Sequence, residues 1–490
     1  MKTQTVRTTV ILGAGFAGTA LAREIREKMP DRRLEAFWDD DPAKIGTSVE
    51  GLRVLGPISA MAQPDSGIEE AFIAIPSATK NQLRSIWNTL VDAGITKVKI
   101  LPTISQIVDG EAHLVLTREI DPQDLLGRNP VQISLRESLK YLRGKRVMIT
   151  GAGGSIGSEL ARQLLSGGAE RLYLYGHGEN SIYNIDKELR QLQAGGVGEG
   201  STIVPVIGDL KDQGHLEFLM SRMKVDVIFH TAAHKHVPLA EANPVEAVTN
   251  NVFGTHHLLE AALAAGVSRF VLISTDKAVE PNSIYGATKR ICEDLVLEAD
   301  SRAADSRFLV VRFGNVLGSR GSIIPLFREQ ILAGGPVTIT DKRMTRYFMT
   351  IPEAVTLVLQ AGGVGAGGNV YLLDMGEPIA IEDLASQIIR FHGKEPHKDI
   401  AFRYIGLRPG ERLEETLWAP DEEPVPTAFA RLNRLVRPVP ARDLRPFLVL
   451  LSPICFFDTD QPTRYRNRQH LRTVLRAWCP TLEDKDEPEY

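Results

Sequence analysis

The sequence predicts an α/β protein with two doubly wound parallel-sheet domains, the second of which carries a smaller C-terminal substrate-binding part. Three observations lead to this prediction. The chain has 490 residues, which are too many for one ordinary hydrophobic core. Two glycine-rich turns each follow a strand-like run and open a helical pattern. After the second turn, strand-like and helical runs alternate, which is typical of a parallel sheet with helices on both faces.

The first glycine-rich turn lies near the start of the chain. A strand-like run at 10–12 leads into a Gly-x-Gly-x-x-Gly turn that begins at Gly13, and three aspartates from Asp39 stand at about the distance of a ribose-binding acid. By itself this pattern indicates a second dinucleotide site, and the alternative is a nucleotide-binding or purely structural domain without chemistry. Nothing resembling a catalytic set follows the aspartates, which favours the alternative. We therefore expect a Rossmann-like accessory nucleotide-binding domain at 1–120, without chemistry of its own, and a linker at 121–143. Its other elements are strand-like runs at 34–37 and 71–75 and helical patterns at 19–29 and 81–93.

The second turn opens the larger domain, placed at 144–425, with its substrate-binding part starting at about residue 318. Residues 426–490 are a C-terminal extension to which the sequence assigns no role. Strand-like runs lie at 171–175, 203–207, 225–229, 270–274 and 308–313. Helical patterns lie at 181–193, 215–223, 244–265 and 285–298.

Glycines at the second turn suit a dinucleotide. Gly151, Gly154 and Gly157 let backbone N–H groups approach a pyrophosphate at a helix N-terminus. Asp209 ends a later strand where an adenine contact is expected. The ribose position holds Gly176 instead of an acid. His177 is placed to face a 2′-phosphate and Glu179 to reach the ribose, so the choice between NAD and NADP stays open.

Two acid–base pairs follow the strand at 270–274. Tyr285 and Lys289 are four residues apart on a predicted helix, so they share one face, and the lysine charge is expected to lower the pKa of the tyrosine. Asp276 and Lys277 add a second pair. They line one pocket only if the strand ends at Ser274 or Thr275, and they are otherwise a surface ion pair of little consequence. An alcohol oxidation needs one pair, so two pairs indicate an oxidation coupled to another proton transfer, such as an elimination.

A histidine cluster lies between the second glycine turn and the two acid–base pairs. His230, His234 and His236 surround Lys235, but no Cys, Asp or Glu within the cluster completes a metal site. We interpret it as a loop that lines the cofactor and substrate.

Polar and cationic side chains collect after residue 314. Guanidinium groups suit a diphosphate, so this set indicates an anionic substrate, although a single such arginine is more often a solvated surface residue. The set comprises Asn315, Ser319, Arg320, Arg346 and Arg408.

Composition excludes several classes of protein. Hydrophobic residues make up 43% and charged residues 24%, as in soluble globular proteins, and a net charge of −4 argues against nucleic acid as the main partner. Three cysteines are too few for a disulfide framework, which fits a reducing cytoplasm. We expect no signal peptide and no membrane insertion. The apolar run at 447–457 contains Pro453 and is far short of the roughly 20 residues of a membrane helix, so we expect a buried element.

Taken together, the motifs resemble nucleotide-sugar 4,6-dehydratases of the polysaccharide-biosynthesis branch of the extended short-chain dehydrogenases. The resemblance covers about residues 8–420, and it includes the linker motif at 124–128 and the first domain with its segment 37–42. The long members of this branch usually begin with membrane helices, which this chain does not show, and several carry Met at the position of Tyr285. The segments that carry the resemblance are 150–160, 232–238, 274–278, 312–319, 344–349 and 407–411.

The resemblance implies a tightly bound, recycled NAD or NADP, no metal, and a UDP-linked N-acetylhexosamine substrate, most often UDP-N-acetylglucosamine. It implies that Tyr285, tuned by Lys289, takes the C4 hydroxyl proton, Lys277 removes the C5 proton and Asp276 protonates the leaving C6 hydroxyl, with Thr275 near C4. Lys277 is then expected to be partly neutral and Asp276 partly protonated. The implied catalytic residues are Thr275, Asp276, Lys277, Tyr285 and Lys289. The implied cofactor-binding residues are Gly151, Gly154, Ser155, Ile156, Gly157, His177, Glu179, Asp209, Leu210, Ala232, Ala233, Lys235, Asn251, Tyr285 and Lys289. The implied substrate-binding residues are His236, Asn315, Ser319, Arg320, Arg346, Arg408 and Glu411.

Two other functions stay open. A UDP-sugar 4-epimerase would use the same cofactor and the same Tyr–Lys pair, although it needs no Asp–Lys pair. A non-catalytic sugar-nucleotide sensor would use the two nucleotide domains alone. In each case we expect a homo-oligomer, formed through the helices at 244–265 and 285–298. The configuration at C5 and the acyl group of the substrate stay open.

Overall fold

The computed structural model describes residues 6–61, 67–95, 97–101, 118–119, 139–303, 305–437 and 443–484. They belong to two compact units, one within residues 1–137 with 190–199 and the other within 138–189 and 200–490. Each unit is built on a mainly parallel sheet, so the predicted α/β class is confirmed. Of the predicted linker at 121–143, residues 121–138 lie outside the described part of the chain.

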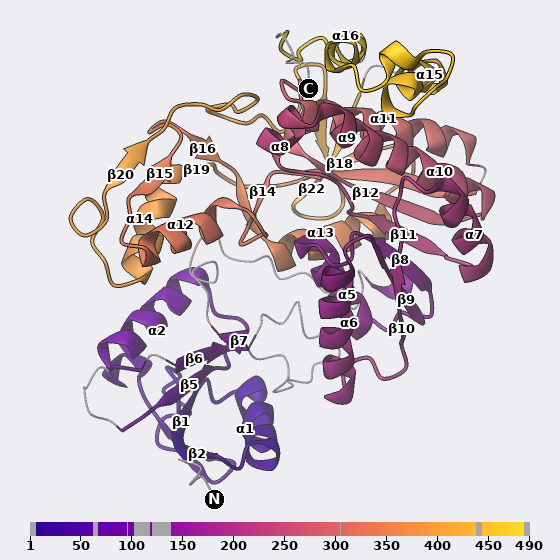
Figure 1. The fold of residues 1–490 in the computed structure, drawn as a ribbon. Coiled ribbons are helices and arrows are strands. Elements are labelled where there is room, and N and C mark those ends of the chain that lie inside the picture. Colours follow the sequence, from indigo (N-terminus) through magenta and orange to yellow (C-terminus); the bar gives the residue numbers. More distant parts are fainter. Residues whose placement is uncertain are drawn as a thin grey trace, which may run out of the picture. The chain divides into compact units, whose positions relative to one another are not determined.

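The N-terminal unit contains a sheet of seven strands in the order β3-β4-β2-β1-β5-β6-β7 (Figure 1). The central strands pair in parallel, and β3 and β7 pair antiparallel with β4 and β6. The strands are β1 (Arg7–Leu12), β2 (Arg32–Trp38), β3 (Ser48–Val49), β4 (Leu52–Leu55), β5 (Glu70–Ile73), β6 (Lys97–Ile100) and β7 (Arg118–Glu119). The helices are α1 (Phe16–Lys28), α2 (Lys80–Asp92) and the 3-10 turn η1 (Ile58–Met61).

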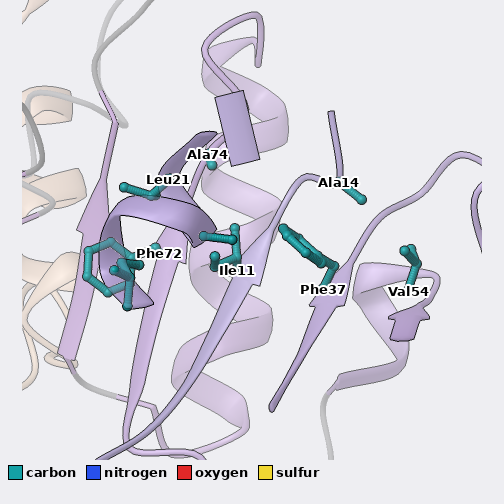
Figure 2. Close-up of a cluster of buried hydrophobic side chains, with 9 residues drawn as sticks. Ile11, Ala14, Leu21, Phe37, Val54, Phe72 and Ala74 are labelled. Atoms are coloured by element: carbon teal, nitrogen blue, oxygen red, sulfur yellow. The ribbon is translucent and has the colours of Figure 1, made fainter. Parts of the chain in front are cut away.

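The core of this unit forms where α1 packs on the sheet. Ile11 of β1, Leu21 of α1, Phe37 of β2 and Phe72 of β5 are fully buried in one cluster (Figure 2). Burial of such side chains stabilises a fold by about 1.5–3 kcal/mol each. The cluster therefore fixes the glycine turn that joins β1 to α1.

The larger unit has a sheet of nine strands in the order β10-β9-β8-β11-β12-β13-β18-β22-β21. The first six strands are parallel and follow the order 3-2-1-4-5-6 of the dinucleotide-binding fold. The chain reverses direction across the sheet between β8 and β11, where such folds bind ligands. These strands are β8 (Arg146–Thr150), β9 (Arg171–Gly176), β10 (Thr202–Ile207), β11 (Val227–His230), β12 (Arg269–Thr275), β13 (Arg307–Phe313), β18 (Val370–Leu373), β21 (Glu423–Pro426) and β22 (Leu432–Val436).

Helices cover both faces of this sheet (Figure 1). The predicted helix at 244–265 is divided by one π-turn, a feature frequent at functional sites. The helices and turns are η4 (Lys140–Leu142), α5 (Ser155–Ser166), α6 (Glu179–Ala194), α7 (Gln213–Met223), α8 (Val237–Ala242), α9 (Pro244–Val248), the π-turn η5 (Thr249–Phe253), α10 (Gly254–Ala264), the 3-10 turn η6 (Asp276–Ala278), α11 (Ile284–Arg302) and α13 (Ile351–Val364).

After β13 the chain forms three two-stranded sheets, β14–β17, β15–β20 and β16–β19. These small sheets lie mostly in the part that the sequence analysis begins at about residue 318 and predicts to bind substrate. The elements are β14 (Asn315–Leu317), α12 (Ile323–Leu332), β15 (Val337–Ile339), β16 (Thr345–Arg346), β17 (Phe348–Thr350), β19 (Ile379–Ala380), α14 (Ile381–Phe391) and β20 (Phe402–Tyr404).

The C-terminal segment is part of the larger unit. Strand β22 lies within the predicted 426–490 extension, yet it pairs antiparallel with β18 and so belongs to the main sheet. Helices α15 (Arg445–Cys455) and α16 (Arg468–Trp478), separated by η7 (Pro462–Arg464), both contact α9. They cover part of the helical surface that we expected to pair between subunits. The run at 447–457 is only partly buried, because Val449 is 70% exposed.

No helix in the described part of the chain is both long and apolar enough to cross a membrane.

A buried charge network joins Glu422 and Arg437, which lie late in the chain, to the main sheet and to α11. Arg312 of β13 is fully buried and donates to both Glu293 of α11 and Glu422, with N–O distances of 2.6–3.1 Å. Glu293 also accepts from Ser274 of β12 at 2.7 Å and from Arg437. Burial raises the pKa of Glu293, but the guanidinium groups of Arg312 and Arg437 outweigh it and hold this pKa well below its usual range.

We expect Arg312→Met to destabilise the larger unit by about 3–5 kcal/mol, because it removes the fully buried one of the two cations, Arg312 and Arg437, that Glu293 and Glu422 share. Urea denaturation of the variant measures this loss. Arg343→Met is the matched control, since Arg343 forms an exposed pair with Asp341 and its loss should leave the transition in place. Equal shifts in the two variants would contradict the role of the network.

Candidate active site

The glycine turn between β8 and α5 is held by close backbone contacts. Gly151 has φ +68°, and a Cβ there would lie 2.8 Å from the backbone of Ala232. A Cβ on Gly157 would lie 2.3 Å from the carbonyl oxygen of Gly151. Gly154 is the N-cap of α5 and supplies no side-chain cap, so the first turn of α5 offers N–H groups to an anion. The predicted turn Gly151–Gly157 therefore has the shape that a pyrophosphate site requires.

Asn251 ties the loop after β11 to the neighbouring helices. Its side-chain oxygen accepts from His234 N at 2.8 Å, and its amide nitrogen donates to His234 O and to Thr288 Oγ1, both at 3.0 Å. It lies in the π-turn η5 and is almost fully buried. The loop that holds the predicted residues Ala232, Ala233 and Lys235 is thus positioned against α11.

The three histidines of the cluster do not act together. His230 is buried between two hydroxyls, at 2.7 Å from Thr150 Oγ1 and 2.8 Å from Thr255 Oγ1, and burial lowers its pKa to about 3. It is a neutral core histidine that holds β11. His236 instead lies against Gly321, at the start of the predicted substrate-binding part. Within the described ranges, no three His, Cys, Asp or Glu side chains are grouped to hold a metal.

The segment after β12 places an acid and a base together. The strand ends at Thr275, and Asp276–Ala278 form a 3-10 turn whose cap is the Thr275 hydroxyl. The condition on the strand end is therefore met, and Asp276 and Lys277 form an ion pair with each other. Lys277 Nζ lies 3.1 Å from Asp276 Oδ1 and 3.4 Å from Asn315 Oδ1.

Glu415 completes this set and was not predicted. Its carboxylate is buried and lies 3.3 Å from Lys277 Nζ, and also 3.7 Å from Arg346 Nε. It belongs to a loop far along the chain from Lys277. The Arg-Pro-Gly-Glu motif at 408–411 was the one nearby sequence signal.

The ionic state of Lys277 differs from the expectation. Burial lowers its pKa, but the carboxylates of Asp276 and Glu415 outweigh burial and raise the pKa above its ordinary value. The structure therefore corrects the prediction of a partly neutral lysine, since two anions stabilise the ammonium form. Asp276 Oδ1 accepts from Thr275 Oγ1 at 2.9 Å, whereas its buried Oδ2 has no partner among the described residues.

Tyr285 and Lys289 share the first turns of α11, as predicted, and α11 begins with the Ser283 cap. Burial raises the pKa of Tyr285 to about 12, and the charge that opposes this rise is that of Lys277. Burial also lowers the pKa of Lys289. The pKa of Tyr285 thus lies above its ordinary value and not below it, as was expected from Lys289, because burial outweighs the nearby positive charge.

The predicted anion-binding side chains divide into two groups. Arg346 is buried and donates to the carbonyls of Thr345, Arg412 and Leu413, so its guanidinium supports the Glu415 loop. Arg320 lies over the glycine turn, donating its side chain to Gly153 O at 2.9 Å and its backbone N–H to Ser155 Oγ at 3.1 Å.

The remaining predicted residues are placed by their contacts within the chain. Lys235 Nζ donates to Ser319 Oγ at 3.4 Å, and burial lowers its pKa. Asp209 accepts from Lys211, and Leu210 beside it is buried. The His177 ring lies 6.5 Å from that of His234, and Glu179 begins α6. Arg408 is exposed and bonds through its backbone N–H to Glu411.

Comparison with known proteins decides the family. Residues 147–436 match the polysaccharide biosynthesis protein family, which is more than half of the chain. The chain belongs to this family. The resemblance read from the motifs is thereby confirmed for the polysaccharide-biosynthesis branch of the extended short-chain dehydrogenases.

Individual family relatives and a solved structure agree with this membership. The capsular polysaccharide biosynthesis protein CapD of Staphylococcus aureus is 43% identical over 416 residues, 84% of this chain and 68% of that protein. An inverting UDP-N-acetylglucosamine 4,6-dehydratase of Campylobacter jejuni is 34% identical over 282 residues, 57% of this chain and 79% of that protein. A UDP-glucose 4-epimerase of Rickettsia prowazekii is also 34% identical, over 346 residues, 68% of this chain and 95% of that protein. The X-ray structure of Pen from Bacillus thuringiensis has a TM-score of 0.54 and 31% identity, covering 62% of this chain and 89% of that chain.

We expect Glu415→Gln to lower the pKa of Lys277, because the substitution removes one of the two anions that stabilise the ammonium group. NMR titration of the lysine ε-carbon, assigned with Lys277→Arg, measures the change. Glu395→Gln removes an exposed carboxylate paired with Lys398 and serves as the control. An unchanged titration in Glu415→Gln would contradict the charge balance described above.

Proposed function

We propose that the protein catalyses the NAD(P)-dependent dehydration of a UDP-N-acetylhexosamine, in the first instance UDP-N-acetylglucosamine, to the 4-keto-6-deoxy sugar nucleotide. The observation that carries the proposal is the Asp276–Lys277 pair within one buried charged set. This pair supplies an acid and a base beyond what an alcohol oxidation needs. Membership in the family, and the relative named as a 4,6-dehydratase, support the reaction class.

The glycine turn and the loop around Asn251 fit a nicotinamide dinucleotide. The close contacts of Gly151 and Gly157 leave no room for side chains, and the uncapped start of α5 favours a pyrophosphate. The residues that would hold the dinucleotide are those of the turn, with Asp209, Lys235 and Lys289. When bound, a nicotinamide dinucleotide supplies the hydride acceptor for C4 and the hydride donor for C6.

Tyr285 takes the proton of the C4 hydroxyl. In the described state its pKa is about 12, so the phenol is protonated and needs a nearby cation to become a base. Lys277 is the cation that lowers this pKa. The oxidation and the elimination are therefore coupled through one lysine, whose charge assists the first step and whose neutral form is needed in the second.

Lys277 removes the C5 proton once C4 is a ketone, because the carbonyl then makes that proton acidic. Transfer of a proton from Lys277 Nζ to Asp276 Oδ1, 3.1 Å away, leaves the lysine neutral and the aspartate protonated. Asp276 then gives this proton to the C6 hydroxyl, which leaves as water. Asp276 Oδ1 is held by Thr275 and Lys277, whereas Oδ2 has no partner in the described part of the chain. The proton lost from C5 and the proton gained by the C6 oxygen thus pass through neighbouring side chains, and Lys277 would return its proton to C5 at the end of the reaction.

A UDP-sugar 4-epimerase is the second candidate, because the Rickettsia relative that bears this name matches 68% of the chain. Epimerisation uses Tyr285 and the cofactor but leaves C5 and C6 unchanged. It gives no role to the buried Asp276–Lys277–Glu415 set, which is why we favour dehydration.

We expect Lys277→Met to lower the rate of water loss from UDP-N-acetylglucosamine by at least about 100-fold, because a general base typically contributes this much to the rate. Lys342→Met, in an exposed turn, is the matched control and should retain full turnover. Production of the 4-keto-6-deoxy sugar, followed by mass spectrometry, measures both variants. Turnover by Lys277→Met at the control rate would overturn the assignment.

A further inference from the structure

We propose that the N-terminal unit contains a second ligand site, built from its own residues, for a nucleoside diphosphate or one of its esters. The site is a cavity of about 780 Å³ between the glycine turn after β1, the loop after β2 and the start of α2. This volume lies within the range of pockets that bind small organic ligands. The cavity is lined by Gly15, Phe16, Lys44, Ile58, Ser77 and Ile86, among others.

Three glycines form the turn, and only two of them are explained by packing within the chain. A Cβ on Gly13 would lie 2.7 Å from Ala74 O, and one on Gly18 would lie 1.9 Å from Gly13 O. A Cβ on Gly15 would meet nothing within 4 Å, and the φ of Gly15 is −91°, which any residue adopts. The fold therefore does not require glycine at position 15. Close approach of a ligand to the backbone does require it.

The first turn of α1 is suited to an anion. Gly15 is the N-cap, no side chain caps the turn, and no acidic residue lies in it. The neighbouring helix α2 differs, because Thr79 and Gln82 form a complete capping box at its start. The two helix starts border one cavity, and only that of α1 is left without a side-chain cap. We place the phosphates of the ligand there.

The aspartates after β2 are engaged in contacts within the chain and are not arranged to bind the ribose of a dinucleotide. Asp39 accepts from the backbone of Ala14 at 2.7 Å and of Asp41 at 2.9 Å, and from Lys44 Nζ at 3.1 Å. Burial raises the pKa of Asp39, but these donors outweigh it and hold the pKa below its usual value. Asp40 accepts from Ile58 N at 2.7 Å. Asp39 and Asp40 therefore hold the loops that line the cavity. A dinucleotide would use an acid at this position to bind its ribose, so the arrangement favours a nucleoside diphosphate as the ligand.

Apolar side chains provide the place for the nucleoside. Pro57 and Ile58 line the cavity from one segment, and Ile75 and Ile86 line it from two others. Phe16 also lines it and is 73% exposed, an unusual exposure for an aromatic side chain next to a glycine turn. A planar base stacked on such side chains and a diphosphate at α1 would together use both parts of the cavity.

Hydrogen–deuterium exchange with mass spectrometry tests this site in the full chain, because it reports each segment separately. ADP, UDP and inorganic pyrophosphate are added in turn to the wild-type protein. We expect ADP or UDP to slow exchange in residues 13–18 and 76–86, with pyrophosphate alone acting more weakly. Peptides covering 151–157 report the other glycine turn, so a failure of the proposed enzymatic function would be seen separately from a failure of this site.

Gly15→Asp is the decisive variant. An aspartate at this N-cap should keep or raise the stability of α1. It should nevertheless weaken nucleotide binding, measured as protection from hydrogen–deuterium exchange, roughly tenfold or more, because it places an anion beside the phosphates. Gly15→Val blocks the same approach without charge. Gly200→Val is the control, because a Cβ there also meets nothing within 4 Å.

Three results would overturn the proposal. They are the absence of protection by ADP and by UDP, protection that persists in both Gly15 variants, and protection by pyrophosphate equal to that by the nucleotides.

Discussion

The buried pairing of Arg312 with Glu293 and Glu422 is the constraint on which the larger unit depends. Arg312 comes from the central sheet, Glu293 from the helix that carries Tyr285 and Lys289, and Glu422 from the segment that follows Glu415. Ser274 donates to the same Glu293, directly before Thr275 and Asp276. The network around Arg312, which also includes Arg437, thus joins the three segments that supply the candidate catalytic groups. Removing a single partner from such a network is costly, because charges remain buried without compensation.

This arrangement gives the candidate site a preset charge balance. Lys277 is held between two carboxylates that favour its charged form, while Tyr285 is desolvated and held in its protonated form. The described state is therefore one in which neither group is yet a base. Binding of cofactor and substrate must supply the change in electrostatics that activates them, a common division between the fixed groups of an active site and its ligands.

Much of the fold could be predicted from the sequence, because local patterns determine it. The two glycine turns and the alternation of strands and helices follow from neighbouring residues, whereas the end of β12 at Thr275 was only a condition for pairing Asp276 with Lys277. Glu415 could not be predicted, because it reaches Lys277 through a loop distant along the chain. The opposite shift of the Tyr285 pKa was missed for a related reason. Spacing along a helix shows which residues are neighbours, but it does not show how far burial outweighs their charges.

The sequence assigned no role to the C-terminal segment, because short strands at the edge of a sheet carry little sequence pattern of their own. Strands β21 and β22 complete the main sheet, and α15 and α16 lie on α9 (Figure 1). Arg472 of α16 is buried against Glu241, whose other oxygen accepts from Ile284 N at the start of α11. The segment thereby supports the helix that bears Tyr285.

The central claim is that the Asp276–Lys277 pair makes the reaction an elimination. A proton NMR time course with UDP-N-acetylglucosamine in deuterated water tests it most directly. We expect a new C6 methyl signal and deuterium at C5, because the C5 proton exchanges with solvent when water is lost. A sugar that keeps its C6 hydroxyl and its C5 proton while the C4 configuration inverts would contradict the claim and identify an epimerase.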